Sequence, residues 1–485
     1  MSETAKRIVK NSILRIGGYA IGALVHFAIV VLIARYLGAE GFGHFAFIFA
    51  FVGIFQLIVD MGVRNILIRD IAVDRAHFAE KLGVARVLLW VLSFVSMGLI
   101  ILLANLLSFS DELRHSTYLA GLAVIISFSG LGYSAVLRAF EEMEWDILGF
   151  VLQRLINIAL VWALMNTDLG LRGVFGTLFL ANGFQYLYYW AVVRILHGRA
   201  ALTFDLRAGF VLLRDSFPLG VAEVLRRLTW QLDKLLLAAL STPLAVALFA
   251  VGYKFLEVMN PFTANLTLPL YPVYARLAQA SPTRLYTAYG QSLKFLYVLG
   301  TPIAVILFVL SDRIVVLFFG EAYREAGEVL RILAPAVILL LPTSVYGYVF
   351  TALGRQRVYT GCVAAALAIN LLLDLLLIPF YSYIGAAVGT LVGEAILFLS
   401  GLMMLRQFGA GLTTVMLMWR PAVAGLVLGF LCWVVKELDF AAVLFGIGGG
   451  LATYALLLLL LQTFSRQEIT LLMEAMRVRL GNVVQ

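Results

Sequence analysis

The sequence contains little charge and little cysteine, and each shortage excludes a class of protein. Asp, Glu, Lys and Arg make up 13% of the 485 residues, about half the share usual in a soluble domain. The two cysteines, Cys362 and Cys432, lie in apolar segments, so neither a disulfide framework nor a metal cluster is expected. No GxxxxGK[ST] phosphate loop is present, and the connecting stretches are too short for a soluble catalytic domain. We therefore expect no enzyme activity, no cofactor and no bound metal.

Long apolar runs, in contrast, are abundant. Hydrophobic residues make up 62% of the chain, and runs of roughly 20 residues, enough to cross about 30 Å of hydrocarbon as a helix, recur from end to end. We count about fourteen, which predicts an all-α polytopic membrane protein. The predicted spans are 13–36, 44–63, 84–107, 117–137, 147–165, 172–194, 216–240, 245–275, 288–310, 329–352, 358–378, 384–405, 416–435 and 441–463.

Lysine and arginine fall mainly on one side of the predicted spans. The N-terminus carries Lys6, Arg7 and Lys10, and basic residues in short loops are retained in the cytoplasm. An even number of spans then places both termini in the cytoplasm and the protein in the cytoplasmic (inner) membrane. The net charge of +8 is spread over many loops, so we attribute it to contact with anionic membrane lipids and expect no nucleic-acid binding.

The chain carries a weak internal repeat. At an offset of about 213 residues, Tyr133 aligns with Tyr346 and Gly176-Thr177 with Gly389-Thr390. Ordered matches of this kind predict two six-helix lobes related by a pseudo-two-fold axis along the membrane normal, with two further helices at the C-terminus. The predicted domains are residues 1–200 (N-lobe), 201–410 (C-lobe) and 411–485, the last ending in an interfacial helix.

Charged side chains inside the apolar spans are candidate functional residues, because hydrocarbon accepts a charge only where it faces protein, water or a ligand. In the first span a polar stripe of Arg15, Tyr19, Gly22 and His26 follows helical spacing. The candidates for a cationic, substrate-binding cleft are Arg15, His26, Arg154, Arg226, Arg227 and Lys254. The candidates for binding a coupling ion are the carboxyl groups of Asp60, Asp233, Glu257 and Asp374.

A structural role for the same residues stays open at this stage. Ion pairs can tie helices together without touching a substrate. Three pairs fit this interpretation: Arg15 with Asp60, Glu223 with Arg227, and Lys254 with Glu257.

A motif that joins the first two spans resembles that of a known family. The run from Ile33 to Gly43, IARYLGAEGFG, is similar to the [LI]ARYLGxEGFG signature of polysaccharide or lipid-linked oligosaccharide flippases. These are the Wzx-type members of the multidrug/oligosaccharidyl-lipid/polysaccharide (MOP) exporter superfamily. Further matching stretches are Phe217–Gly220, Asp233–Leu237, Ala250–Lys254, and the later series Asn370, Pro379 and Gly385–Ala387. The resemblance covers roughly residues 5 to 405.

The resemblance implies a fold like that of the multidrug (MATE) exporters and a flippase function. The substrate would be a polyprenyl-pyrophosphate-linked oligosaccharide, moved by alternating access from the inner to the outer leaflet for cell-surface polysaccharide biosynthesis. Arg226 and Arg227 would then suit the pyrophosphate, because guanidinium groups bind phosphate oxygens in pairs. H+ or Na+ is a candidate coupling ion, and the polysaccharide polymerisation machinery a candidate partner.

Two alternatives stay open. A peptidoglycan lipid-precursor flippase would also use fourteen spans and a cationic cleft. An ion-coupled multidrug antiporter of the same superfamily would instead offer an anionic or aromatic pocket.

Overall fold

The computed structural model describes residues 3–200, 202–407 and 418–463. Within these ranges some side chains lie outside the described part, namely those of residues 3–16, 57, 60, 218–230, 260–262, 264, 265, 268 and 282. Every regular element in the described ranges is a helix, which confirms the all-α prediction. The predicted interfacial helix after residue 465 falls outside the described residues.

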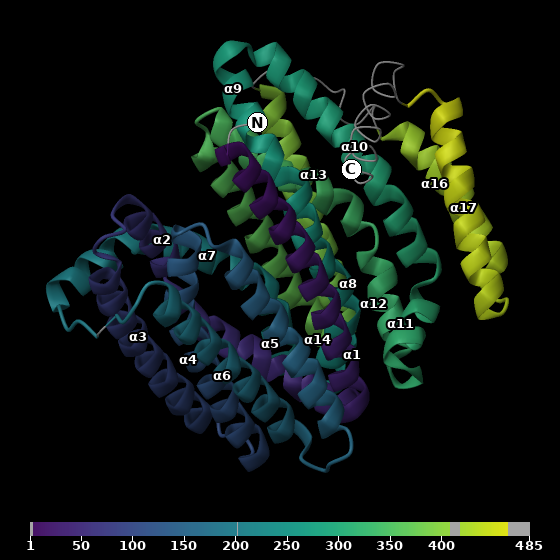
Figure 1. Cartoon of the computed structure of the whole chain (residues 1–485). Helices are drawn as coiled ribbons and strands as arrows, with labels where there is room; N and C mark the ends of the chain where they lie inside the picture. Colours follow the sequence, from purple (N-terminus) through teal and green to yellow (C-terminus); the bar gives the residue numbers. More distant parts are fainter. Residues whose placement is uncertain (1–2, 201, 408–417, 464–485) are drawn as a thin grey trace. The chain divides into compact units, whose positions relative to one another are not determined.

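The first six predicted spans correspond to five long helices (Figure 1). These are α1 (Glu3–Asp60), α3 (Phe78–Leu106), α4 (Asp111–Ala139), α5 (Met143–Leu164) and α6 (Gly170–Leu196), with a short α2 (Val63–Val73) after the first. Helix α1 contains the first two spans, which meet at Gly38 (φ 69°, ψ 178°). Glycine suits this break because it adopts positive φ without a steric penalty.

The remaining helices follow the later spans with two differences. They are α7 (Leu206–Leu240), α8 (Pro243–Thr267), η1 (Leu268–Leu270), α9 (Tyr271–Ala280), α10 (Pro282–Val309), α11 (Ser311–Phe319), η2 (Glu321–Tyr323), α12 (Ala326–Leu333), α13 (Ala336–Ala352), α14 (Gln356–Gln407), α16 (Trp419–Val435) and α17 (Phe440–Leu460). The predicted span 245–275 is broken at η1, which contains Pro269. The predicted span 329–352 is two helices bent by 48°, because Pro335 at the break has no N–H to donate.

Several helices are suited to crossing a membrane. In the described part, seven are long and apolar enough, or eight if α12 and α13 form one span. Of these, α1 and α14 each contain two predicted spans, which meet at Gly38 and Ser382. The protein is therefore a multi-pass membrane protein, and the total of fourteen spans stays a prediction.

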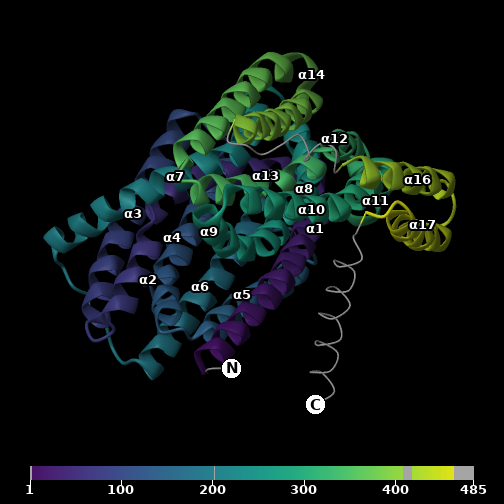
Figure 2. The same cartoon turned by 90° about the horizontal axis from the view of Figure 1, so that it is seen from above.

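The helices pack into two compact units. The first contains residues 1–262, 318–323 and 371–386, and the second contains 263–317, 324–370 and 387–485. In the first unit, α4 packs between α3 and α6, and α5 packs against α1 and α6 (Figures 1 and 2). In the second, α10 packs against α13 and α16. The predicted domain boundaries near 200 and 410 rest on the sequence repeat, and they stay a prediction.

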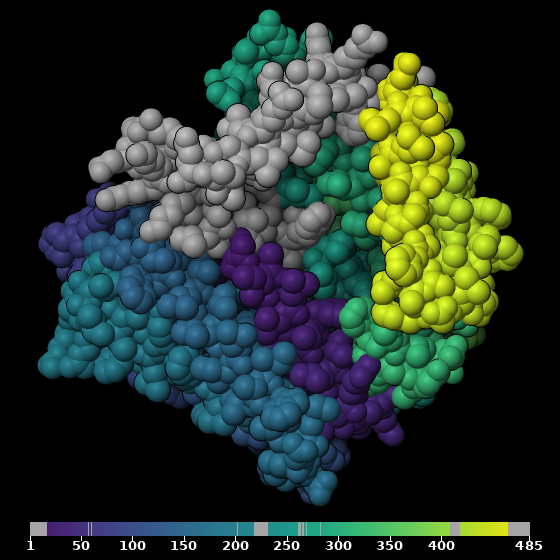
Figure 3. Space-filling view, turned by 45° about the vertical axis from the view of Figure 1, so that its right-hand side comes forward, coloured from purple at the N-terminus to yellow at the C-terminus, as the bar shows by residue number. Residues whose placement is uncertain are grey.

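The last two helices form a pair with an apolar outer face. Helices α16 and α17 pack on each other around Leu428 and Tyr454 and appear in yellow in Figure 3. Their outward side chains include Leu426, Phe430 and Phe445, which are 75%, 61% and 82% exposed. Large apolar side chains exposed to this extent on a paired helix are typical of contact with lipid.

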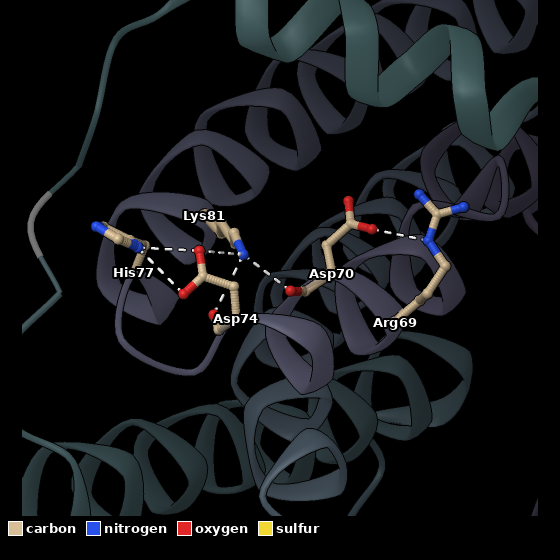
Figure 4. A network of polar contacts seen from close by, with 5 residues as sticks. All are labelled: Arg69, Asp70, Asp74, His77 and Lys81. Atoms are coloured by element: carbon tan, nitrogen blue, oxygen red, sulfur yellow. Dashed lines mark hydrogen bonds and ion pairs between the residues drawn. The ribbon is translucent and has the colours of Figure 1, made fainter.

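A polar network holds the turn between α2 and α3 (Figure 4). The Lys81 ammonium donates to the Asp70 carbonyl oxygen (2.8 Å), the Asp74 carbonyl oxygen (3.2 Å) and the Asp74 carboxylate (3.0 Å). His77 also contacts that carboxylate, at 2.9 Å. Hydrogen bonds from Lys81 and His77 lower the pKa of Asp74 below its ordinary value. The lysine thereby adds hydrogen bonds to carbonyl groups at the end of α2, where backbone donors are few; the Asp70 carbonyl also accepts from the Asp74 N–H at 3.2 Å.

Candidate functional site: an arginine-lined cavity

The first unit contains a cavity of about 360 Å³ bounded by α1, α2, α4, α5 and α6. Three arginines from three different helices line it: Arg64, Arg138 and Arg154. The polar remainder of the wall is made of the neutral residues Tyr19, Gln56, Ser127, Ser134, Gln153, Asn182, Gln185 and Tyr189. No carboxylate is among its described lining residues. We call this space the arginine cavity.

Arg138 is fixed by a carboxylate behind the cavity wall. Its Nε donates to the Asp146 carboxylate at 2.8 Å, and its Nη2 donates to the Tyr19 hydroxyl at 3.2 Å. The Ser134 hydroxyl donates to the other Asp146 oxygen at 2.5 Å. Asp146 is 3% exposed, so its charge is neutralised by Arg138, as a buried carboxylate requires.

Arg154 contacts His26 across the interface of α5 and α1. The Arg154 Nη1 lies 3.1 Å from the His26 Nδ1, and the guanidinium also lies 5.3 Å from the centroid of the Phe150 ring. A Cβ on Gly22 would fall 2.2 Å from that ring, so only glycine permits the close helix approach. The predicted stripe of Tyr19, Gly22 and His26 therefore faces α5. The side chain of Arg15 lies outside the described part.

Amide side chains complete the wall between α5 and α6. Gln153 donates to the Asn182 carbonyl oxygen at 3.1 Å, and Asn182 donates in turn to the backbone oxygen of Ala123 at 3.0 Å. Tyr189 donates to the backbone oxygen of Asp146 at 2.8 Å. Guanidinium, amide and phenol groups around one space can bind the oxygens of phosphates and the hydroxyls of sugars.

A second charged cluster joins α7 to α8. The Glu257 carboxylate accepts hydrogen bonds from Lys234 at 2.7 Å and from Lys254, and the Lys234 ammonium lies 5.3 Å from the Tyr253 ring centroid. His26 interacts electrostatically with Lys254 and Glu257 as well as with Arg154. The histidine therefore connects this cluster with Arg154. The predicted ion pair of Lys254 with Glu257 is confirmed.

Two buried carboxyl groups lie beside this cluster. Asp233 in α7 and Asp374 in α14 are 2% and 0% exposed and interact with each other. Both carboxyl oxygens of Asp374 are buried and find no hydrogen-bond partner among the described residues. Glu257, in contrast, is already neutralised by two ammonium groups. The remaining ion candidate, Asp60, has its side chain outside the described part.

The structure thus brings together part of the predicted set and adds to it. Among the predicted cations, Arg154 and His26 meet, and Lys254 lies near them. The side chains of Arg226 and Arg227 lie outside the described part. Two cavity residues, Arg64 and Arg138, were missing from the predicted set. Both directly follow a predicted span, Arg64 after 44–63 and Arg138 after 117–137, so neither is a charge inside a predicted apolar segment.

Comparisons with known proteins identify the family of the chain. The family model described as "Polysaccharide biosynthesis protein" matches residues 8–278, and the MatE model matches residues 218–376. A relative from Shigella flexneri, described as a candidate O-antigen transporter, is 22% identical over 79% of this chain and 93% of its own length. A relative from Haloferax volcanii, described as a candidate low-salt glycan biosynthesis flippase, is 23% identical over 77% of this chain and 78% of its own length.

Solved structures show the same fold. The chain is similar to the lipid II flippase MurJ in its inward closed conformation, with a TM-score of 0.74 at 13% identity, over 94% of this chain and 99% of that one. It is also similar to an inward-facing multidrug resistance MATE family transporter of the MOP superfamily, with a TM-score of 0.62 at 17% identity, over 80% of this chain and 95% of that one. The fold and the resemblance predicted from the sequence are confirmed, and the chain belongs to the polysaccharide biosynthesis protein family.

Proposed function

We propose that this protein is a flippase, which moves a polyprenyl-pyrophosphate-linked oligosaccharide from the inner to the outer leaflet of the cytoplasmic membrane by alternating access. It is a transporter rather than an enzyme. The relatives described as glycan flippases and transporters support this class. The lysine and arginine distribution supports cytoplasmic termini.

The observation that carries the proposal is the arginine cavity. Sugars and phosphates do not cross hydrocarbon unaided, because each unsatisfied polar group and each charge costs several kcal/mol. Three guanidinium groups line the cavity and, among the described side chains, one carboxylate, Asp146, neutralises one of them, which leaves this part of the wall net positive. Such a wall suits the pyrophosphate or an acidic sugar, and its amide and phenol groups suit sugar hydroxyls.

The positive charge of the arginine cavity also distinguishes between the two alternative functions, the multidrug antiporter and the peptidoglycan-precursor flippase. A cationic drug would meet repulsion in the arginine cavity, which offers no carboxylate among its described lining residues. This disfavours the multidrug antiporter. A peptidoglycan lipid precursor carries a pyrophosphate as well, so the cavity accommodates both flippase hypotheses, and only the substrate tested can separate them.

For energy coupling, we propose that the carboxyl pair of Asp233 and Asp374 binds H+ or Na+. The pair is buried, and binding of one cation would relieve its charge repulsion. Asp233→Asn is expected to abolish acceleration of transport by an imposed ion gradient, while slow transport without a gradient continues. Equal acceleration of the wild type and the variant would contradict the coupling proposal.

The function is tested by transport in proteoliposomes. A fluorescent polyprenyl-pyrophosphate oligosaccharide is placed in one leaflet, and its transfer is followed by quenching from outside. The wild type is compared with Arg154→Gln and with the control Arg172→Gln, which removes an exposed guanidinium at the start of α6, away from the cavity. A charge-assisted contact contributes about 1.5–3 kcal/mol, so Arg154→Gln is expected to slow transfer about tenfold or more, and Arg172→Gln to leave it unchanged.

Each outcome has a definite meaning. Transfer that is equally fast in both variants would keep the flippase and remove the cavity from the proposal. Transfer of a peptidoglycan precursor but of no other glycan lipid would favour the peptidoglycan alternative. Failure of folded wild-type protein to move any glycan lipid, together with export of a cationic dye, would overturn the proposed function.

A further inference from the structure

A second basic pocket, separate from the arginine cavity, lies between α3, α4 and α6. Its volume is about 340 Å³, and its charged lining consists of Arg86, Arg194 and Arg199. Tyr133 and Trp190 supply its aromatic walls. No acidic residue is among its described lining residues, and the nearby Glu142 carboxylate pairs with His197 at 2.8 Å. We call this space the surface pocket.

The arginines of the surface pocket are held by aromatic rings. The Arg86 guanidinium lies 5.0 Å from the centroid of Tyr133, and that of Arg194 lies 5.1 Å from the centroid of Trp190. Arg86 also donates to the backbone oxygen of Ala200 at 3.3 Å. A guanidinium stacked on a ring keeps its N–H groups directed outward in the plane, where they can bind an oxyanion.

One buried donor in the surface pocket has no partner among the described residues. This donor is Arg86 Nε, which is inaccessible to solvent. The hydroxyl of the buried Tyr133 interacts with Tyr186, so Tyr133 contributes its ring to the pocket wall. Buried donors are normally satisfied, because leaving one unpaired carries its full desolvation penalty. The surface pocket therefore has donor capacity that an acceptor from outside the chain can use.

The position of the surface pocket suggests where that acceptor comes from. Arg86 lies near the start of α3, Tyr133 near the end of α4 and Arg194 in the last turn of α6. These helix ends all lie on the side that the lysine and arginine distribution assigns to the cytoplasm. Trp190 and the 80% exposed Ile195 lie on the same turns. Tryptophan beside arginine is typical of the level of lipid headgroups.

We propose that the surface pocket binds a phosphate group at the membrane surface, and that an anionic phospholipid of the cytoplasmic leaflet supplies it. The phosphate oxygens accept from Arg86 and the two exposed arginines, Arg194 and Arg199. The acyl chains lie along the apolar surface beside Trp190. A soluble phosphate has the same acceptor chemistry but no chains, which allows the two sources to be distinguished.

The test is native mass spectrometry of the purified full chain in detergent, with phosphatidylglycerol or phosphatidylcholine added at matched concentrations. Each surface arginine contributes about fivefold to anionic lipid affinity. Arg194→Gln is therefore expected to weaken phosphatidylglycerol binding about fivefold, and Arg194→Gln/Arg199→Gln roughly thirty-fold. The matched control is Arg172→Gln, at the opposite end of the same helix, which is expected to bind as the wild type does.

A second control keeps the aromatic wall in place. Tyr133→Phe retains the ring under Arg86 and removes only the hydroxyl that interacts with Tyr186, so it should fold normally and bind phosphatidylglycerol as the wild type does. Equal binding of both lipids, or unchanged binding in the double arginine variant, would overturn the proposal. Displacement of phosphatidylglycerol by about 10 mM inorganic phosphate would refute the lipid source, since a headgroup anchored by its chains should resist it.

Discussion

Replacing Glu257 by glutamine tests whether the charged cluster between α7 and α8 holds the protein together or serves transport. The carboxylate binds two ammonium groups, and the side chains of Lys234, Lys254 and Glu257 are 7%, 14% and 23% exposed. Glutamine has nearly the same shape but no charge, so it leaves two cations close together in a buried site. Removing one partner of a buried ion pair costs about 3–5 kcal/mol. We expect Glu257→Gln to lower the free energy of unfolding by that amount.

The measurement is the apparent Tm in detergent, taken as the temperature at which the protein is no longer monodisperse on gel filtration. The control is the triple variant Lys234→Met/Glu257→Met/Lys254→Met, which removes all three charges. Apolar groups of similar size often replace buried ion pairs without loss, so the triple variant should recover most of the Tm lost in Glu257→Gln. A wild-type Tm for Glu257→Gln, or a triple variant no more stable than the single one, would refute this reasoning.

The triple variant also separates structure from transport. If it is stable and moves the glycan lipid at the wild-type rate, the cluster only ties α7 to α8. If it is stable but inactive, the cluster takes part in transport, as the sequence predicts for Lys254 and Glu257. The stability measurement and the transport measurement therefore answer different questions on the same protein.

Two further predictions concern packing and pH. A Cβ on Gly43 would lie 1.8 Å from the backbone oxygen of Pro243, so reaching an ordinary 3.4 Å contact needs a shift of 1.6 Å. Gly43→Ala should therefore lower the free energy of unfolding by about 1–3 kcal/mol. The control is Gly53→Ala on the same helix, which should retain the wild-type Tm because its Cβ has no neighbour nearer than 3.9 Å. The lowered pKa of Asp74 means that its ionised form adds stability above the unfolded pKa of about 3.9, and that this stability is lost as pH falls through the folded pKa. The difference in Tm between the wild type and Asp74→Asn should thus be present at about pH 7 and shrink as pH falls below the unfolded pKa of about 3.9; a difference that does not change with pH would contradict the role of Lys81 and His77.

The helices were predictable from the sequence because apolar length alone fixes a membrane span. The breaks at Pro269 and Pro335 were harder to place. Proline removes a backbone donor wherever it occurs, but Pro302 and Pro342 lie inside continuous helices. A proline bends a helix or ends it depending on whether a neighbouring helix offers a donor to the carbonyl that the proline leaves unpaired. The sequence around the proline does not show which helix will be its neighbour.

The site was predictable only where its residues share one helix. The spacing of Tyr19, Gly22 and His26, and that of Lys254 and Glu257, gave the correct faces because helical periodicity fixes them. Arg138 binds Asp146 across the turn between α4 and α5, and no periodicity connects two helices. Arg64 lies in the short helix α2, which has too few apolar residues to be predicted as a span.

The break in α1 has a mechanical consequence. The two arms of the helix change direction at Gly38 (Figure 1), and no loop separates them. His26, which contacts Arg154, is on the first arm, and Gln56, which lines the arginine cavity, is on the second. Glycine changes φ and ψ with little steric penalty, and hinges are built from a few residues of this kind. Gly38 is therefore the point at which the arm that holds His26 can tilt against the arm that holds Gln56 while both arms stay helical.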